Sequence, residues 1–124
     1  MCEVKKYIAI DKIDVFTPLI DTETIVYNQD IKGTIFKDAN NNFKDIDYLI
    51  VTPFWLKAQA DRLANFHRTK SGLNVKVVTL SGIYNEFSSG KQDIGAIRNF
   101  VKYVYENASE ESKRVKYLCL FGDA

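Results

Sequence analysis

The sequence has few of the residues that build disulfide or metal sites: two cysteines and one histidine among 124 residues. Cys2 and Cys119 lie far apart and form neither a disulfide framework nor a metal-ligand spacing. No apolar run reaches the roughly 18 residues that a membrane helix needs. The first 20 residues lack the apolar core of a secretory signal peptide. These absences argue against a disulfide-stapled scaffold and a cysteine-ligated metal.

The chain also lacks an excess of charge and the common nucleotide motifs. Its 17 basic and 16 acidic residues give a net charge of +1, and no basic block stands out, so no nucleic-acid partner is predicted. Neither G-x-G-x-x-G nor G-x-x-x-x-G-K occurs, and no G-x-S-x-G elbow is present. The sequence therefore predicts no cofactor.

What is present is typical of a globular protein, with 46% hydrophobic and 13% aromatic residues. Residues 1–46 are rich in β-branched and aromatic residues at 7–10, 25–27 and 34–36, separated by turn-forming residues. We interpret 1–46 as the end of a preceding β-rich region. Residues 47–124 follow a different pattern and are predicted to form a separate unit.

In residues 47–124, apolar runs alternate with helical patterns. The run at 48–51 is continuous rather than alternating, which indicates a strand covered on both faces. Alternating strands and helices predict a parallel sheet with right-handed crossovers, three layers and the strand order 2-1-3, as in flavodoxin-like α/β folds. The expected strands are 48–51, 74–79 and 116–121, and the expected helices are 54–70, 81–87 and 94–108.

The helical patterns also predict which side chains face the sheet. Gly72 supplies a left-handed residue to end the first helix, and Asp93 is the expected N-cap of the last one. Placing residues every ~100° around the axis gathers apolar side chains on one face of each helix. The inward set is Trp55, Leu56, Ala60, Leu63, Ala64 and Phe66 in the first helix, and Ile94, Ile97, Phe100, Val101, Val104, Tyr105 and Ala108 in the last.

Three residues are candidates for chemistry: Asp123, His67 and Cys119. Asp123 follows the third strand at the carboxyl edge of the sheet, where open α/β sheets bind ligands. A local turn is the favoured interpretation, because a metal site there would need an acidic pair after the first strand, where Thr52-Pro53 stands.

His67 and Cys119 are predicted to be structural. His67 falls in the apolar arc of the first helix, near its C-terminus, where partial burial or hydrogen bonds to the last carbonyls are expected. Cys119 lies mid-strand beneath a helix, whereas a nucleophile needs exposure and a lowered pKa. The sequence therefore contains no assembled catalytic set, assigns no metal ligand and leaves the substrate-binding residues unknown.

Several segments resemble one enzyme family when they are taken in order. They are DYLIVTP at 47–53, the Gly72-Leu73 turn into the second strand, IYNEFSSG at 83–90, DIGAIRNFV from Asp93, and the closing LCLFGD. Together they resemble the start of the gingipain-type cysteine peptidase domain, over residues 47–124. The resemblance implies a caspase-like fold and a catalytic Cys-His dyad that lies well downstream of these segments. Neither His67 nor Cys119 stands in the place of either catalytic residue.

The resemblance implies that the chain is an N-terminal fragment of a cysteine endopeptidase and inactive by itself. The parent would act on proteins at the cell surface, at the outer membrane or after secretion. The expected role is that of a type IX secretion sortase of Bacteroidetes, which cleaves C-terminal sorting domains from secreted proteins. Its expected partners are the downstream catalytic subdomain, protein substrates and other secretion components. The alternative is a non-catalytic flavodoxin-like binding or scaffold module.

Overall fold

Three parallel strands form the centre of the computed structural model, which describes Asp11 and residues 29–122. The strands β1 (Tyr48–Thr52), β2 (Val75–Thr79) and β3 (Tyr117–Leu120) lie in the order β2-β1-β3. Ile50 is paired with Val77 on one side and with Cys119 on the other, and both pairings are parallel. The predicted α/β fold with strand order 2-1-3 is therefore confirmed.

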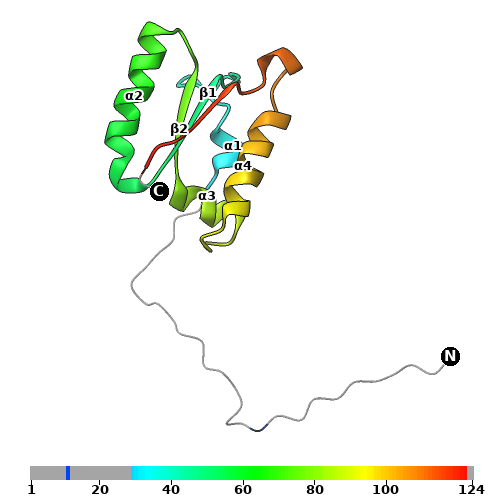
Figure 1. Cartoon of the computed structure of the whole chain (residues 1–124). Coiled ribbons are helices and arrows are strands. Elements are labelled where there is room, and N and C mark those ends of the chain that lie inside the picture. Colours follow the sequence, from blue (N-terminus) through cyan, green and yellow to red (C-terminus); the bar gives the residue numbers. More distant parts are fainter. Residues whose placement is uncertain (1–10, 12–28, 123–124) are drawn as a thin grey trace, which may run out of the picture.

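Helices cover both faces of this sheet (Figure 1). One face carries α2, and the opposite face carries α1, α3 and α4. Connections between parallel strands are almost always right-handed, so the β1–β2 and β2–β3 crossovers, which run in opposite directions across the sheet, are expected to place their helices on opposite faces. The helical elements are α1 (Ile31–Thr34), η2 (Phe54–Leu56), α2 (Lys57–Lys70), α3 (Leu80–Phe87), α4 (Ile94–Glu106) and η3 (Glu111–Lys113).

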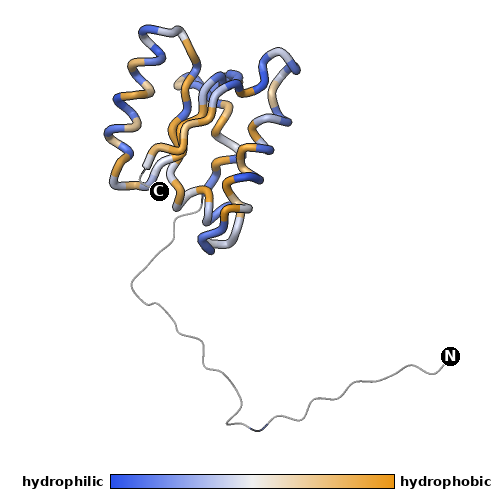
Figure 2. Tube along the Cα trace, viewed as in Figure 1, coloured by the Kyte–Doolittle hydropathy of each residue, from blue (hydrophilic) through white to orange (hydrophobic). Residues whose placement is uncertain are grey.

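The face beneath α2 is packed with small side chains. Ala60 and Ala64 are fully buried against Ile50 and Val75. Alanines at i and i+4 lie on one side of a helix, so the helix backbone can approach the sheet closely. Figure 2 shows the apolar colour concentrated along the strands between the two helical layers.

The opposite face carries the larger core. Leu49 and Val51 of β1 point toward α3 and α4, where Ile83, Phe100 and Val104 are buried. Alternate residues of β1 point to opposite faces of the sheet, and each face packs against an apolar core. The apolar run at 48–51 is therefore continuous, as predicted. This core also contains Ile35, Phe36, Ile46, Val78 and Ala96.

Predicted caps begin and end the long helices. The Asp93 carboxylate accepts a hydrogen bond of 2.7 Å from the Gly95 N–H at the start of α4. Gly72 has φ +65° just beyond α2, and the Leu73 N–H returns to the His67 carbonyl at 3.4 Å. Both helix ends could be predicted from the sequence, because a cap depends on residues only a few positions apart.

The predicted β segment at 34–36 is wrong. A short helix, α1, occupies Ile31–Thr34, and a turn follows it. Asp30 caps α1 through the Gly33 N–H at 3.1 Å, and Glu86 accepts the N–H groups of Ile31 and Lys32 at 2.6 and 2.9 Å. These contacts outweigh the strand preference of the β-branched and aromatic residues at 34–36.

The other expected β segments, 7–10 and 25–27, lie outside the described residues. The division of the chain at 46/47 stays a prediction. Ile35, Phe36 and Ile46 nevertheless pack into the same core as β1 and α4. The last residues before the predicted boundary therefore contribute to the α/β unit.

Several side chains predicted to face the sheet are exposed instead: Trp55, Phe66, Ile94 and Tyr105. Trp55 is 78% exposed because it lies in the 3-10 turn η2, where helical spacing of 100° does not apply. Ile94 is 85% exposed because the buried side of α4 is centred on Ala96, Phe100 and Val104. The predicted arc was therefore rotated from the true one.

Candidate functional site

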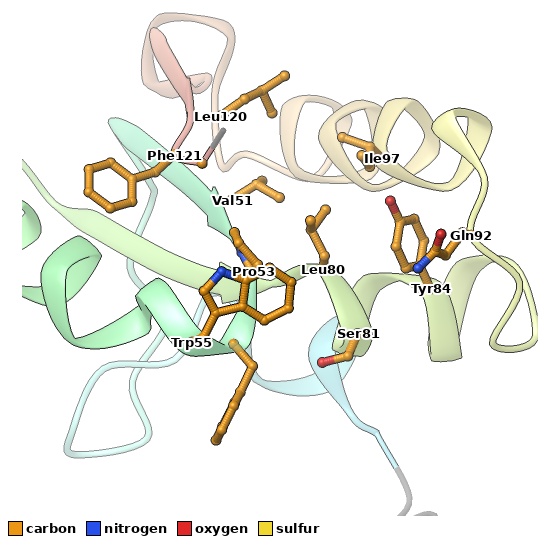
Figure 3. Close-up of a pocket in the computed structure, with 12 residues that line it drawn as sticks. Val51, Pro53, Trp55, Leu80, Ser81, Tyr84, Gln92, Ile97, Leu120 and Phe121 are labelled. Atoms are coloured by element: carbon orange, nitrogen blue, oxygen red, sulfur yellow. The ribbon is translucent and has the colours of Figure 1, made fainter. Parts of the chain in front are cut away.

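The carboxyl ends of the three strands surround a cleft of about 560 Å³ (Figure 3). Its walls come from the residues that follow β1, from the start of α3, from the region around the start of α4, and from the end of β3. The lining side chains are mostly apolar: Val51, Pro53, Phe54, Trp55, Leu80, Ser81, Tyr84, Gln92, Ile97, Leu120, Phe121 and Gly122.

The Pro53-Phe54-Trp55 turn shapes one wall of the cleft. Pro53 has an extended backbone, with φ −66° and ψ 153°, and the 3-10 turn η2 then reverses the chain before α2 begins. Phe54 and Trp55 consequently project outward at the sheet edge and are among the most exposed large apolar side chains described. The sequence does not reveal this turn, because residues 54–56 also fit the first turn of the predicted helix 54–70.

The polar groups of the cleft are the side chains of Ser81, Tyr84 and Gln92. The Ser81 hydroxyl lies 3.4 Å from the Thr79 hydroxyl, which itself caps α3 through the Gly82 N–H. Among the described residues that line this cleft, no nucleophile is paired with a general base. Its chemistry suits the binding of apolar groups, with a few hydrogen bonds to orient them.

His67 lies at the opposite end of the sheet from the cleft. It is half-buried near the C-terminus of α2, with its ring centroid 5.0 Å from that of Tyr48, the first residue of β1. Its Nδ1 is 3.4 Å from the Ser71 hydroxyl. His67 therefore takes part in aromatic packing and a contact at the helix end.

Cys119 occupies the middle of β3 and is half-buried, not fully covered by a helix as expected. The expectation failed because β3 is an edge strand: its neighbours Leu118 and Leu120 are 47% and 64% exposed. Burial raises the pKa of Tyr48, and the adjacent Cys119 thiol raises it further. Tyr48 thus contacts both Cys119 and His67. Among the described residues, no hydrogen bond joins Cys119 directly to His67.

Asp123 lies outside the described residues. In the part of the chain that the structure describes, no group of three or more His, Cys, Asp or Glu side chains is arranged to hold a metal ion. Every helix in that part is too short or too polar to cross a membrane.

Comparisons with known proteins show which family this α/β unit resembles. The family model for peptidase family C25 matches residues 41–124. The crystal structure of dimeric latent PorU from Porphyromonas gingivalis is similar, with a TM-score of 0.52 and 37% sequence identity over 60% of this chain. The match covers 7% of the PorU chain. A search of curated proteins finds no match. Since the family model matches more than half of this chain, the chain belongs to peptidase family C25, the gingipain family, which has a caspase-like fold.

Proposed function

We propose that the chain is part of a gingipain-like cysteine endopeptidase that acts as a type IX secretion sortase. The observation that carries the proposal is the 37% identity to PorU, together with the family match that begins at residue 41. In this role the enzyme removes C-terminal sorting domains from secreted proteins at the cell surface or outer membrane. Its partners are protein substrates and other components of the secretion system.

The reaction of such an enzyme is acyl transfer through a cysteine thioester. The thiolate attacks the carbonyl carbon of the scissile peptide bond, the C–N bond breaks, and the histidine gives its proton to the leaving amine. Water or an acceptor group on a surface lipopolysaccharide then attacks the thioester and releases the thiolate. Cys119 is half-buried within a strand, and in the described part of the chain His67 contacts the Ser71 hydroxyl instead. The proposal therefore assigns the dyad to later parts of the polypeptide and gives this segment a supporting role beside it.

Active-site labelling with a peptidyl chloromethyl ketone tests the proposal. The 124-residue chain should stay unlabelled, and a longer polypeptide from the same gene should be labelled once. Cys119→Ser serves as the control and should leave labelling of the longer polypeptide unchanged. Replacement of a cysteine at the end of a later strand should abolish it. Labelling of Cys119 itself would contradict the proposal.

The identity of the acceptor separates a sortase from a general peptidase. A cargo protein with a C-terminal sorting domain should be cleaved and joined to lipopolysaccharide, which raises its mass on a gel. Release of free cleaved cargo alone would indicate a hydrolytic gingipain-like enzyme. The alternative, a non-catalytic binding or scaffold module, would be favoured if later strands ended without histidine and cysteine.

A further inference from the structure

We propose that Arg68 and Lys76 close the outer side of β2 and prevent it from pairing with β2 of a second copy of the chain. In the strand order β2-β1-β3, β2 pairs only with β1 among the described strands. Its outer side therefore carries backbone groups that another strand can pair with. This role of the two cations is independent of the peptidase assignment, because it depends only on contacts around β2.

The sequence of β2 is one that would self-associate readily if its edge were open. The segment NVKVVT at 74–79 has four β-branched residues, no proline and no glycine, and Lys76 carries its only charge. Six-residue segments with high β-propensity and little charge pair with copies of themselves when they are exposed at the edge of a sheet. The outer side of β2 therefore needs protection.

Arg68 occupies the backbone acceptor at which such pairing would begin. The Asn74 carbonyl accepts the Tyr48 N–H at 3.2 Å and so points toward β1. Because backbone groups alternate along a strand, the Val75 carbonyl points to the outer side. There it accepts hydrogen bonds from Nη2 and Nε of Arg68, at 2.6 and 3.2 Å. Nη1 of the same side chain donates to Asn65 Oδ1 at 2.8 Å, which holds the guanidinium in place.

Lys76 guards the same edge from the opposite face of the sheet. Val75 belongs to the core on the α2 face, so the next side chain along the strand, Lys76, projects on the other face. Its ammonium group donates to the Lys37 carbonyl at 2.6 Å. One cation therefore reaches the edge from α2, and the other joins β2 to the segment on the far side of the sheet. An incoming strand would have to displace both.

The positive charge at this edge also opposes pairing. Burial lowers the pKa of Lys76, and the neighbouring charges of Arg68 and Lys44 lower it further, whereas Asp38 acts in the opposite direction. Three cations thus lie together with one carboxylate beside β2. Two β2 edges paired around a twofold axis would bring the cations of both copies close to one another, and like charges across a strand pair are destabilising.

Removal of both cations tests the proposal. Arg68→Met with Lys76→Thr keeps residue types that suit a helix and a strand. We expect this variant of the 124-residue chain to self-associate in sedimentation velocity. Its Val77 amide, which faces the outer side, should exchange at least about 10-fold more slowly at high than at low protein concentration, because pairing protects it. In the unchanged chain, Val77 exchange should not depend on concentration. The same independence in the variant would overturn the proposal.

Two matched variants separate position from net charge. Lys57→Gln with Lys102→Gln removes the same charge from exposed positions of α2 and α4, where each lysine forms an i,i+4 ion pair. This variant should behave as the unchanged chain, and association equal to that of the test variant would assign the effect to net charge and overturn the proposal. Arg68→Lys with Lys76→Arg keeps both charges and should also leave Val77 exchange independent of concentration.

Reference amides show where any association occurs. Val51, in the central strand, should exchange slowly in every variant. Faster exchange there in the test variant would show association through unfolded chains, and would overturn the assignment to the β2 edge. Protection of Leu118 in β3 without a change at Val77 would do the same. Arg68→Met and Lys76→Thr made singly keep the test decisive if the double variant does not fold: each should give a weaker concentration dependence at Val77, and none in either would contradict the proposal.

Discussion

Asp45 and Ser109 are joined by two hydrogen bonds although 64 residues separate them in the chain. The Ser109 N–H donates to Asp45 Oδ1 at 2.8 Å, and the Ser109 hydroxyl donates to Oδ2 at 2.6 Å. The segment that leads into β1 is thereby tied to the loop between α4 and β3. This link lies at the amino end of the sheet, opposite the cleft.

The Asp45 link should make stability depend on pH. Burial alone would raise the pKa of Asp45, but the hydrogen bonds from Ser109 outweigh it and lower the pKa. The stabilisation is therefore present above the unfolded value of about 3.9 and is lost as the pH falls through the lower folded value. Because the carboxylate is partly solvated, the effect is modest.

Ser109→Ala removes the hydroxyl donor and should lower the free energy of unfolding by about 1 kcal/mol at neutral pH. Urea denaturation at pH 7 and at pH 3 measures the change. The loss should shrink at pH 3, where Asp45 in the unfolded chain is protonated. Ser112→Ala, at an exposed position of the nearby 3-10 helix η3, is the control. An equal loss at both pH values would contradict the role of the Asp45 charge.

Glu86 should hold α1 in place, because its two carboxylate oxygens accept the N–H groups of Ile31 and Lys32. Glu86→Ala leaves both donors without this partner, at an expected cost of about 1–2 kcal/mol. Hydrogen exchange should show faster exchange of these two amides. Glu106→Ala breaks only an exposed i,i+4 pair with Lys102 and should cost less than about 0.5 kcal/mol. Unchanged exchange at Ile31 would exclude the capping role.

The sheet order and the helix caps could be predicted because they depend on information local in sequence. The lengths of the crossovers and their handedness led to β2-β1-β3, and Asp93 and Gly72 are local signals for the ends of helices. The absence of a nucleotide motif likewise followed from spacing alone. Neither the strand order nor a helix cap depends on which side chains of other elements pack against it.

Exposure and long-range contacts could not be predicted in this way. Helix α1 depends on Glu86, which lies 55 positions from Ile31 in the sequence. No local sequence pattern predicts a contact over that separation. Ile94 and Leu120 are as apolar as core residues, yet both are exposed, because burial depends on which element covers them. The cleft was missed for the same reason: three separate strand ends build it.

The close contact between α2 and the sheet should make Ala60 intolerant of larger side chains. Ala60 is a fully buried residue of α2 and belongs to the same core cluster as Ile50 and Val75. Ala60→Leu should cost about 1–3 kcal/mol, because overpacking displaces the helix. Ala58→Leu, on the exposed side of the same helix, should change stability by less than about 0.5 kcal/mol. Thermal unfolding of the two variants measures the difference. Equal Tm values would show that α2 does not pack closely against the sheet.

Tyr48 should be the tyrosine whose ionisation marks the alkaline limit of stability. Burial raises its pKa above 10, and the Cys119 thiol adds to the shift. Because the folded state favours the neutral phenol, its contribution is present below pH 10 and is lost as the pH rises through the folded value. Ultraviolet titration should show a late tyrosine step that Tyr48→Phe removes, whereas Tyr105→Phe, on an exposed ring, is the control and should leave that step in place. Cys119→Ala should shift the late step toward lower pH, and the absence of that shift would show that burial alone sets it.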